Sequence, residues 1–287
     1  MIILKLALYA CAGFLCHLLF PDGAWAWGPG VHAVTALGAL RDAGELMPSI
    51  AGIITSFPRE YMYGSFAADF FIGKSITRRQ DHPHHWEGGF GFLRDAANDR
   101  EAAFAYGFLS HLAADVIAHN FFVPNLLTSP LATPSKGHIY WEVKADRAVG
   151  RGYTRVAKEI LSMEHQACDD LLNLGARTSR NGLAAKKHFF TQTVKFFDYY
   201  NTARHLLLPD EGYEEKAFTD YIAVMVGFSC RMVQNLLMGP DSAPCIRYDP
   251  MGKRNLSTAR RRALLSKATG YPSPVKQFPV AEDLLEL

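Results

Sequence analysis

The stretch REAAFAYGFLSHLAADVIAHNFF, from Arg100 to Phe122, decides the fold because it reads as one long helix. Its apolar residues recur at helical spacing, and Pro124 ends the pattern. Three polar side chains, His111, Asp115 and His119, follow one another at intervals of four. They therefore share one face of the helix over two turns. A buried helix with such a stripe needs partners for all three side chains, which a metal ion would supply; a buried hydrogen-bond network is the alternative.

The same helical periodicity continues through the chain, and alternating runs of Val, Ile and Thr are few. We therefore predict an all-α fold, a compact multi-helix bundle without a clean linker. The last dozen residues, 276–287, are expected to form a loosely packed tail. Further helices are expected over residues 31–46, 138–149, 153–174, 183–207, 214–237 and 257–268, and loops over 74–89, 125–137 and 239–254.

Composition excludes several classes of protein. The 287 residues suffice for a substantial core, and 49% hydrophobic with 20% charged residues is globular rather than disordered. The formal net charge of +2 is too small to indicate a nucleic-acid partner. Three cysteines follow the leader described next, Cys168, Cys230 and Cys245, without a CxxC pattern. Either a Cys230–Cys245 disulfide or three free thiols fits this spacing.

The N-terminus reads as an export signal. Lys5 precedes an apolar run over residues 6–20, and Ala24-Trp25-Ala26 has the form of a cleavage site. We predict a signal peptide over residues 1–26 and a periplasmic or extracellular protein; an uncleaved membrane anchor is the alternative. No later segment is expected to span a bilayer. Cleavage after Ala26 would make Trp27 the first residue of the mature chain.

Other histidines and carboxylates accompany the central stripe, and seven of the 11 histidines lie between His32 and His138. His138 and Glu142 are four residues apart on a predicted helix, and Asp146 continues their stripe. A loop carries His82, His84 and His85, and any of these three could be a metal ligand. Asp69 lies in an apolar stretch, where it either caps a helix or acts catalytically.

These motifs, in their order along the chain, resemble the zinc-dependent phospholipase C family, including the catalytic domain of glycosylphosphatidylinositol-specific phospholipase D. The fungal and plant single-strand zinc nucleases are similar. The resemblance covers roughly Trp27 to Asp146. The motifs are Trp27-Gly-x-x-x-His32, Gly64-Ser-Phe-Ala-Ala-Asp69, the histidine-rich loop, Phe104-Ala-Tyr-Gly107, His111-x-x-x-Asp115-x-x-x-His119, the following Asn120-Phe-Phe-Val-Pro124, and His138-x-x-x-Glu142.

The resemblance implies a site of two to three Zn²⁺ ions. His84, His111 and Asp115 would hold one zinc. A second zinc would be held by His119, His138 and Glu142.

A third zinc would take the amine and carbonyl of Trp27, with His32 and again Asp115. The catalytic carboxylate would be Asp69, which orients or deprotonates the attacking water. Tyr140, Asn120 and Asp146 are candidates for supporting hydrogen bonds.

Two features depart from the family pattern. The last histidine of the stripe follows Asp115 sooner than in the best-known members. Three loop histidines compete for one role, and His84 is chosen by its distance from Asp69.

The resemblance implies an exported zinc phosphodiesterase, preferably a phospholipase C. Its partners would be a phospholipid or other phosphodiester substrate and the membrane surface, with no specific nucleic acid. A single-strand nuclease of the same fold and a non-catalytic zinc-binding protein are the alternatives. The domain is expected to cover residues 27–275, with ligands within 27–146 and supporting helices within 153–268.

Overall fold

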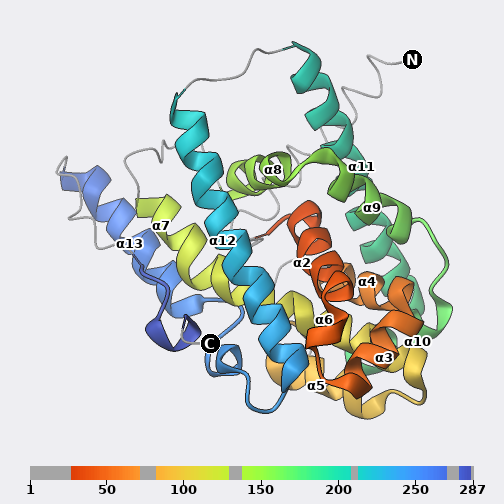
Figure 1. Cartoon of the computed structure of the whole chain (residues 1–287). Coiled ribbons are helices and arrows are strands. Elements are labelled where there is room, and N and C mark those ends of the chain that lie inside the picture. The colour runs from red at the N-terminus through yellow and green to blue at the C-terminus, as the bar shows by residue number, and fades with distance from the viewer. Residues whose placement is uncertain (1–26, 72–81, 129–137, 208–212, 270–277, 286–287) are drawn as a thin grey trace.

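The computed structural model describes residues 27–71, 82–128, 138–207, 213–269 and 278–285; within these it leaves undescribed the side chains of 138–140, 142–143, 197, 200–207, 213–215 and 267. Over this part of the chain it contains helices and no strand, which confirms the predicted all-α class (Figure 1). The predicted signal peptide lies outside the described residues.

The described helices pack against one another (Figure 1). Short 3₁₀ turns join several of them, and a π-helical segment follows α6. The α-helices are α2 (Pro29–Arg41), α3 (Pro48–Ser56), α4 (Pro58–Ala67), α5 (Trp86–Asp95), α6 (Asp99–Ile117), α7 (Val123–Thr128), α8 (His138–Val149), α9 (Arg151–Leu161), α10 (Gln166–Gly175), α11 (Arg180–Leu207), α12 (Tyr213–Met238) and α13 (Lys253–Thr269); the shorter elements are η1 (Ala43–Glu45), η2 (Ala68–Phe70), η4 (Ala118–Phe122), η5 (Pro244–Arg247) and η6 (Glu282–Leu284).

Helix α6 forms the centre of the domain, where α4, α12 and α5 pack against it. Its start is fixed locally, because the Asn98 side chain accepts a hydrogen bond from the Glu101 amide while Glu101 accepts one from the Ala97 amide. Nearly every residue from Ala103 to Ile117 is buried. Because α6 is buried on all sides, its polar stripe is buried with it.

Helices α4 and α6 cross in backbone contact. A Cβ atom added at Gly64 would lie 2.0 Å from the Phe104 carbonyl oxygen, and one at Gly107 would lie 1.9 Å from the Tyr61 oxygen. Only residues without a Cβ permit this approach. The crossing holds the end of α4, and with it η2 and Asp69, beside the polar stripe of α6.

The last residues of the helix predicted over 100–122 form the π-helical segment η4. Its backbone is braced by side chains: Asn120 Nδ2 donates to the Val116 and Asp249 carbonyls, and Asn255 Nδ2 donates to the Asn120 carbonyl. π-Helical segments are frequent at functional sites because they re-aim side chains. Here the segment carries His119.

Several local predictions were wrong. Helices α3 and α4 were not predicted, although Pro48 and Pro58 occupy their first turns, a known start signal. The helix predicted over 153–174 is two helices, α9 and α10. His165 separates them: its Nε2–H donates to the Ile160 carbonyl and its ring stacks on Tyr63 at 3.8 Å.

The loop boundaries also differ from the prediction: α5 begins inside the expected loop 74–89, α7 begins before 125–137 and extends into it, and α13 begins within 239–254. The final segment is not loose over residues 278–285, since Leu284 is fully buried and Asn125 bonds both backbone groups of Phe278. All three described cysteines are free thiols.

Contrary to the sequence expectation, one later helix is long and apolar enough to cross a membrane by length and composition, over Lys216–Met238. Core helices of soluble proteins pass the same test. The buried side of α12 packs on α6 and α2, with Met232, Val233 and Leu236 fully buried, as in a core helix.

Candidate metal centre

Asp115 lies at the centre of a cluster of imidazoles. Its Oδ2 atom is 3.1 Å from His84 Nε2, 3.2 Å from His111 Nε2 and 3.4 Å from His119 Nε2. All four side chains are at most 2% exposed. Zinc bonds of about 2.0–2.2 Å to nitrogen and oxygen put neighbouring ligand atoms of a tetrahedral site roughly 3.4 Å apart. The donor atoms of His84, His111 and Asp115 all lie within 4.8 Å of one another, so the spacing of these three suits ligands of a shared metal.

The histidine-rich loop contributes one side chain to this cluster. His84 Nε2 lies 3.0 Å from His111 Nε2. The other two loop histidines support the backbone. His82 Nε2–H donates to the Phe71 carbonyl while its Nδ1 accepts from the His84 amide, and His85 Nδ1 accepts from the Gly88 amide at the start of α5. Both nitrogens of His82 are thus committed, and of the three only His84 joins the cluster.

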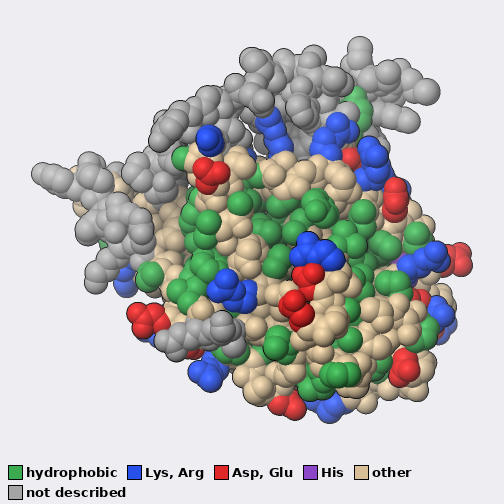
Figure 2. Space-filling model, in the orientation of Figure 1, with side chains coloured by type: hydrophobic (Ala, Val, Ile, Leu, Met, Phe, Trp, Pro, Cys, Tyr) green, Lys and Arg blue, Asp and Glu red, His purple; other side chains and the backbone are tan. Residues whose placement is uncertain are grey.

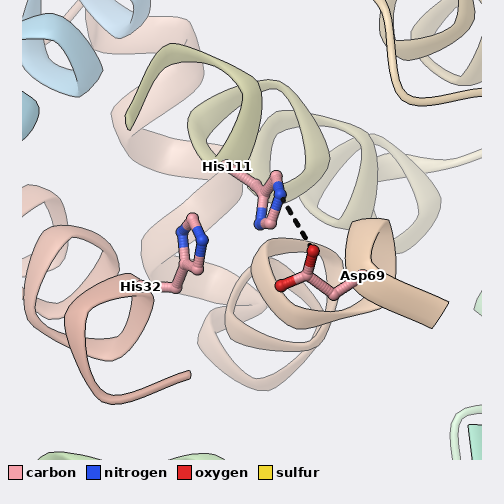
Figure 3. Close-up of side chains that lie close together, drawn as sticks. All are labelled: His32, Asp69 and His111. Atoms are coloured by element: carbon pink, nitrogen blue, oxygen red, sulfur yellow. Dashed lines mark ion pairs between the residues drawn. The ribbon is translucent and has the colours of Figure 1, made fainter. Parts of the chain in front are cut away.

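His32 and Asp69 approach the same centre from α2 and η2 (Figure 3). The ring of His32 stacks on His111 at 3.9 Å, and its Nε2 lies 3.5 Å from Asp115 Oδ1. Asp69 Oδ1 is 3.7 Å from His111 Nε2. Two trios therefore have donor atoms close enough to hold one ion, namely His84–His111–Asp115 and His32–Asp69–His111.

The backbone selects the tautomer of His111. Its Nδ1 lies 2.8 Å from the Ser65 carbonyl oxygen, which can only accept, so Nδ1 carries the hydrogen. In the neutral ring Nε2 then presents its lone pair toward Asp115 and Asp69. Ser65 belongs to α4, so the α4–α6 crossing also orients this ring.

Burial shapes the charges of the site. Burial lowers the pKa of His32, and neighbouring His111 lowers it further, so the ring is neutral at pH 7. Burial alone would raise the pKa of Asp115, but His111 and His119 offset it and hold that pKa well below its ordinary value. A neutral His32 ring and an ionised Asp115 carboxylate are the forms in which these two side chains can bind zinc.

Several polar atoms of the centre are buried without a hydrogen-bond partner among the described residues: both ring nitrogens of His32, both of His119, and Asp115 Oδ1. Leaving such atoms desolvated is costly. A bound cation would satisfy them, and the donor set of imidazole nitrogen and carboxylate oxygen is the one zinc prefers. The residues present therefore fit zinc.

The remaining predicted ligands are His138, Glu142 and the backbone of Trp27. The side chains of His138 and Glu142 lie outside the described residues, although both positions fall on α8 as predicted. The Trp27 indole is described: its Nε1–H lies 2.9 Å from Ser229 Oγ and 3.2 Å from the Ala114 carbonyl, and its ring stacks on Phe122 at 4.4 Å. Coordination by the amine and carbonyl of Trp27 stays a prediction.

A family model described as zinc dependent phospholipase C matches residues 30–188, more than half of the 287-residue chain. The chain belongs to the zinc-dependent phospholipase C family. No curated protein and no solved structure matches it. The match begins just after Trp27 and ends within α11, so it includes every predicted ligand except Trp27. Family membership and the buried His/Asp clusters together support zinc as the metal of this zinc-dependent phospholipase C family member.

Sequence reasoning named Asn120 and Asp146 as supporting groups but not the backbone groups that they bond. Ser65 supports His111 through its backbone, which no side-chain pattern reveals. Asn120 was proposed as a supporting group and does brace η4, but through the backbone carbonyls of Val116 and Asp249. Asp146 binds the start of α2 and is treated below.

Proposed function

We propose that this zinc-dependent phospholipase C family member is an exported phosphodiesterase that hydrolyses phospholipids with two to three bound zinc ions. One observation carries the proposal: three imidazoles meet one carboxylate oxygen of Asp115 in the buried core, and further polar atoms there have no hydrogen-bond partner among the described residues. A buried hydrogen-bond network would pair those atoms instead. Family membership indicates the reaction class.

The proposed ligand groups follow the sequence prediction. His84, His111 and Asp115 hold one zinc, a grouping supported by their mutual distances. His119 would hold a second zinc together with His138 and Glu142.

A third zinc would bind His32, Asp115 and the backbone of Trp27. The 3.5 Å between His32 Nε2 and Asp115 Oδ1 supports a shared ion at that place. The proximity of Asp69 to His32 and His111 also leaves Asp69 a ligand role, which the experiment below separates.

When bound, clustered zinc ions lower the pKa of water and stabilise the attacking and leaving oxygens of an in-line displacement at phosphorus. Asp69 is the proposed catalytic carboxylate. It is 4% exposed, and its Oδ1 faces the His111 ring. In this role it orients the attacking water and accepts its proton, while the buried walls of the site exclude other water.

Phospholipid is the preferred substrate because the family name specifies it and the charge pattern does not favour a nucleic acid. The face shown in Figure 2 has acidic and basic side chains interspersed among apolar ones, without a continuous basic stripe among the coloured atoms. A nuclease that binds single strands would need a basic groove with aromatic platforms. Peripheral contact with a membrane would bring such a substrate to the site.

A paired assay tests the function. The mature protein, reconstituted with zinc, is assayed for hydrolysis of phosphatidylcholine and, in parallel, for digestion of single-stranded DNA. We expect release of the phosphorylated headgroup and no digestion. DNA digestion alone would replace the phospholipase by a nuclease, and zinc binding without either activity would leave a binding protein.

The role of Asp69 is tested by Asp69→Asn, which keeps the shape of the side chain and removes its charge. Elemental analysis should find unchanged zinc, while hydrolysis falls by about 10²–10⁴-fold, the usual contribution of a general base. If zinc is lost as well, Asp69 is a ligand. If neither changes, the carboxylate has no catalytic role.

A further inference from the structure

Asp146 is a buried carboxylate of α8 that bonds the backbone of another helix. Its Oδ2 accepts from the Gly30 amide at 2.9 Å, and its Oδ1 accepts from the Val31 amide at 3.0 Å. Both amides belong to the first turn of α2, which has no side-chain cap of its own. The free N–H groups of a helix start attract a carboxylate through hydrogen bonding and the helix dipole. A residue 115 positions away thus caps α2.

The sequence before α2 makes room for this carboxylate. A Cβ atom at Gly28 would lie 2.6 Å from the Asp146 carboxyl group, and one at Gly30 would lie 2.9 Å from it. Any other residue at position 28 would displace Asp146 or the chain. Both glycines precede His32, within the segment that joins Trp27 to His32.

The two helices that meet at Asp146 carry three of the proposed ligands, His32 on α2 and positions 138 and 142 on α8. Helix α8 holds positions 138, 142 and 146 at intervals of four, so all three share one stripe of the helix. Helix α2 holds His32 directly after the capped Val31 amide. Fixing α2 on α8 therefore fixes one set of ligands relative to the other.

The other end of the segment is held as well. The Trp27 indole is 1% exposed and donates to the Ser229 hydroxyl and the Ala114 carbonyl, so its position in the core is fixed. With Trp27 anchored on one side and Asp146 on the other, the two intervening residues have little freedom. The backbone of residue 27 is then set in place before any metal arrives.

We propose that Asp146 is a positioning residue that clamps the start of α2 to α8 and thereby fixes Trp27 and His32 for the metal centre. The inference rests on the proposed zinc site and adds the group that pre-organises it. Asp146 acts through the Gly30 and Val31 amides and needs no contact with metal or substrate. Burial raises its pKa to about 7, against the two amides that lower it, so the chain bears a cost that a neutral residue would avoid.

A double-mutant cycle tests the clamp in the mature protein: Asp146→Ala, Gly28→Ala and the combined variant. Zinc affinity is measured by competition with a chelator, and zinc per chain by elemental analysis. Each single change should weaken the most weakly held zinc by about 10–100-fold, the usual effect of losing a group that supports a ligand. The combined variant should bind zinc about as tightly as the weaker-binding of the two single variants, because both changes break the same clamp.

Two controls separate positioning from stability. Asp42→Ala removes a carboxylate just beyond the opposite end of α2, where it pairs with Arg41, and should keep wild-type zinc affinity. Ile54→Ala truncates a fully buried side chain of α3, so it should lower the melting temperature but not the zinc affinity. If Asp146→Ala does not fold, Asp146→Asn, which keeps one acceptor oxygen, replaces it in the cycle.

The outcomes are distinct. Wild-type zinc affinity in Asp146→Ala, or additive losses in the combined variant, would overturn the clamp and leave the zinc site intact. Less than one zinc per chain in the wild-type protein would instead overturn the proposed function and this inference together. Weaker zinc binding in Ile54→Ala of the same size as in Asp146→Ala would reduce Asp146 to a contributor to stability.

Discussion

Replacing Gly107 by alanine is expected to separate α4 from α6. The new Cβ would lie 1.9 Å from the Tyr61 carbonyl oxygen, whereas real Cβ contacts essentially never fall below 3.0 Å. The helices must therefore move apart by about 1 Å, because the obstructing atom is backbone and cannot rotate away. Overpacking of this kind typically costs about 1–3 kcal/mol. For a domain of this size each kcal/mol lowers the melting temperature by about 2–4 °C.

Activity should suffer more than stability. Helix α4 supplies the Ser65 carbonyl that orients His111, and η2 supplies Asp69 at 3.7 Å from the same ring. A misplacement of about 1 Å at a reacting centre can reduce the rate by about 10²-fold. We therefore expect Gly107→Ala to melt about 2–12 °C lower and to retain on the order of 1% of the hydrolytic rate.

The matched control is Gly52→Ala, a glycine in α3 whose added Cβ would meet nothing within 4 Å. Alanine there should raise stability by about 0.5–1 kcal/mol, because glycine is a poor helix former. Melting is followed by circular dichroism and hydrolysis by headgroup release, both at saturating zinc. If Gly107→Ala matches Gly52→Ala in melting temperature and rate, the close crossing does not position the site.

Three further expectations concern the metal centre. Asp115→Ala should release more zinc than any other single ligand change and cost roughly 3–5 kcal/mol of stability, as breaking a buried charged network does. Elemental analysis checks the zinc content and thermal melting checks the stability. Retention of full zinc would show that Asp115 does not bridge two zinc ions. In the metal-free Asp146→Asn variant, stability should fall as the pH drops below 6.5, the ordinary histidine pKa, because the unfolded chain then binds protons that folded His32 and His165, with pKa values lowered by burial, do not bind. The substitution removes the opposite effect of Asp146, whose pKa of about 7 makes the folded wild-type chain bind a proton that the unfolded chain does not. A flat melting temperature of this variant between pH 7.5 and 5.5 would contradict the expectation. A chain that begins at Trp27 should hold more zinc and hydrolyse faster than one with an extra uncleavable residue before it, since an amide nitrogen is a poor ligand; equal zinc and rate would show that the amine does not coordinate.

The sequence was most informative where the structure is local. His111, Asp115 and His119 lie on one helix, so their spacing alone placed them together, and the structure confirms that they meet. The choice among His82, His84 and His85 could not be made from spacing with the same force. It depends on the loop path, which the Phe71 carbonyl and the start of α5 determine.

Long-range supports were beyond the sequence for a physical reason. Asp146 accepts from a backbone amide and Ser229 from the Trp27 indole. Every residue except proline has such an amide, and both partners are far away along the chain, so residue spacing does not identify them. The break between α9 and α10 was missed because it is made by His165 bonding a carbonyl and stacking on Tyr63, a tertiary effect that overrides helical periodicity. Helices α3 and α4 were missed despite a readable proline signal.

The contacts of Trp27 also bear on the order in which the parts of the metal centre assemble. The indole has its hydroxyl acceptor on Ser229, 202 residues later, so its full set of contacts, which also includes Ala114 and Phe122, can form only when synthesis is almost complete. Closing so long a loop is slow and must await the helices between its ends. Residues of α6 can meet far earlier, because they are neighbours on one helix. We therefore expect the N-terminal ligand to be the last part of the centre to assemble, so that the finished fold, rather than the nascent chain, receives its full complement of metal.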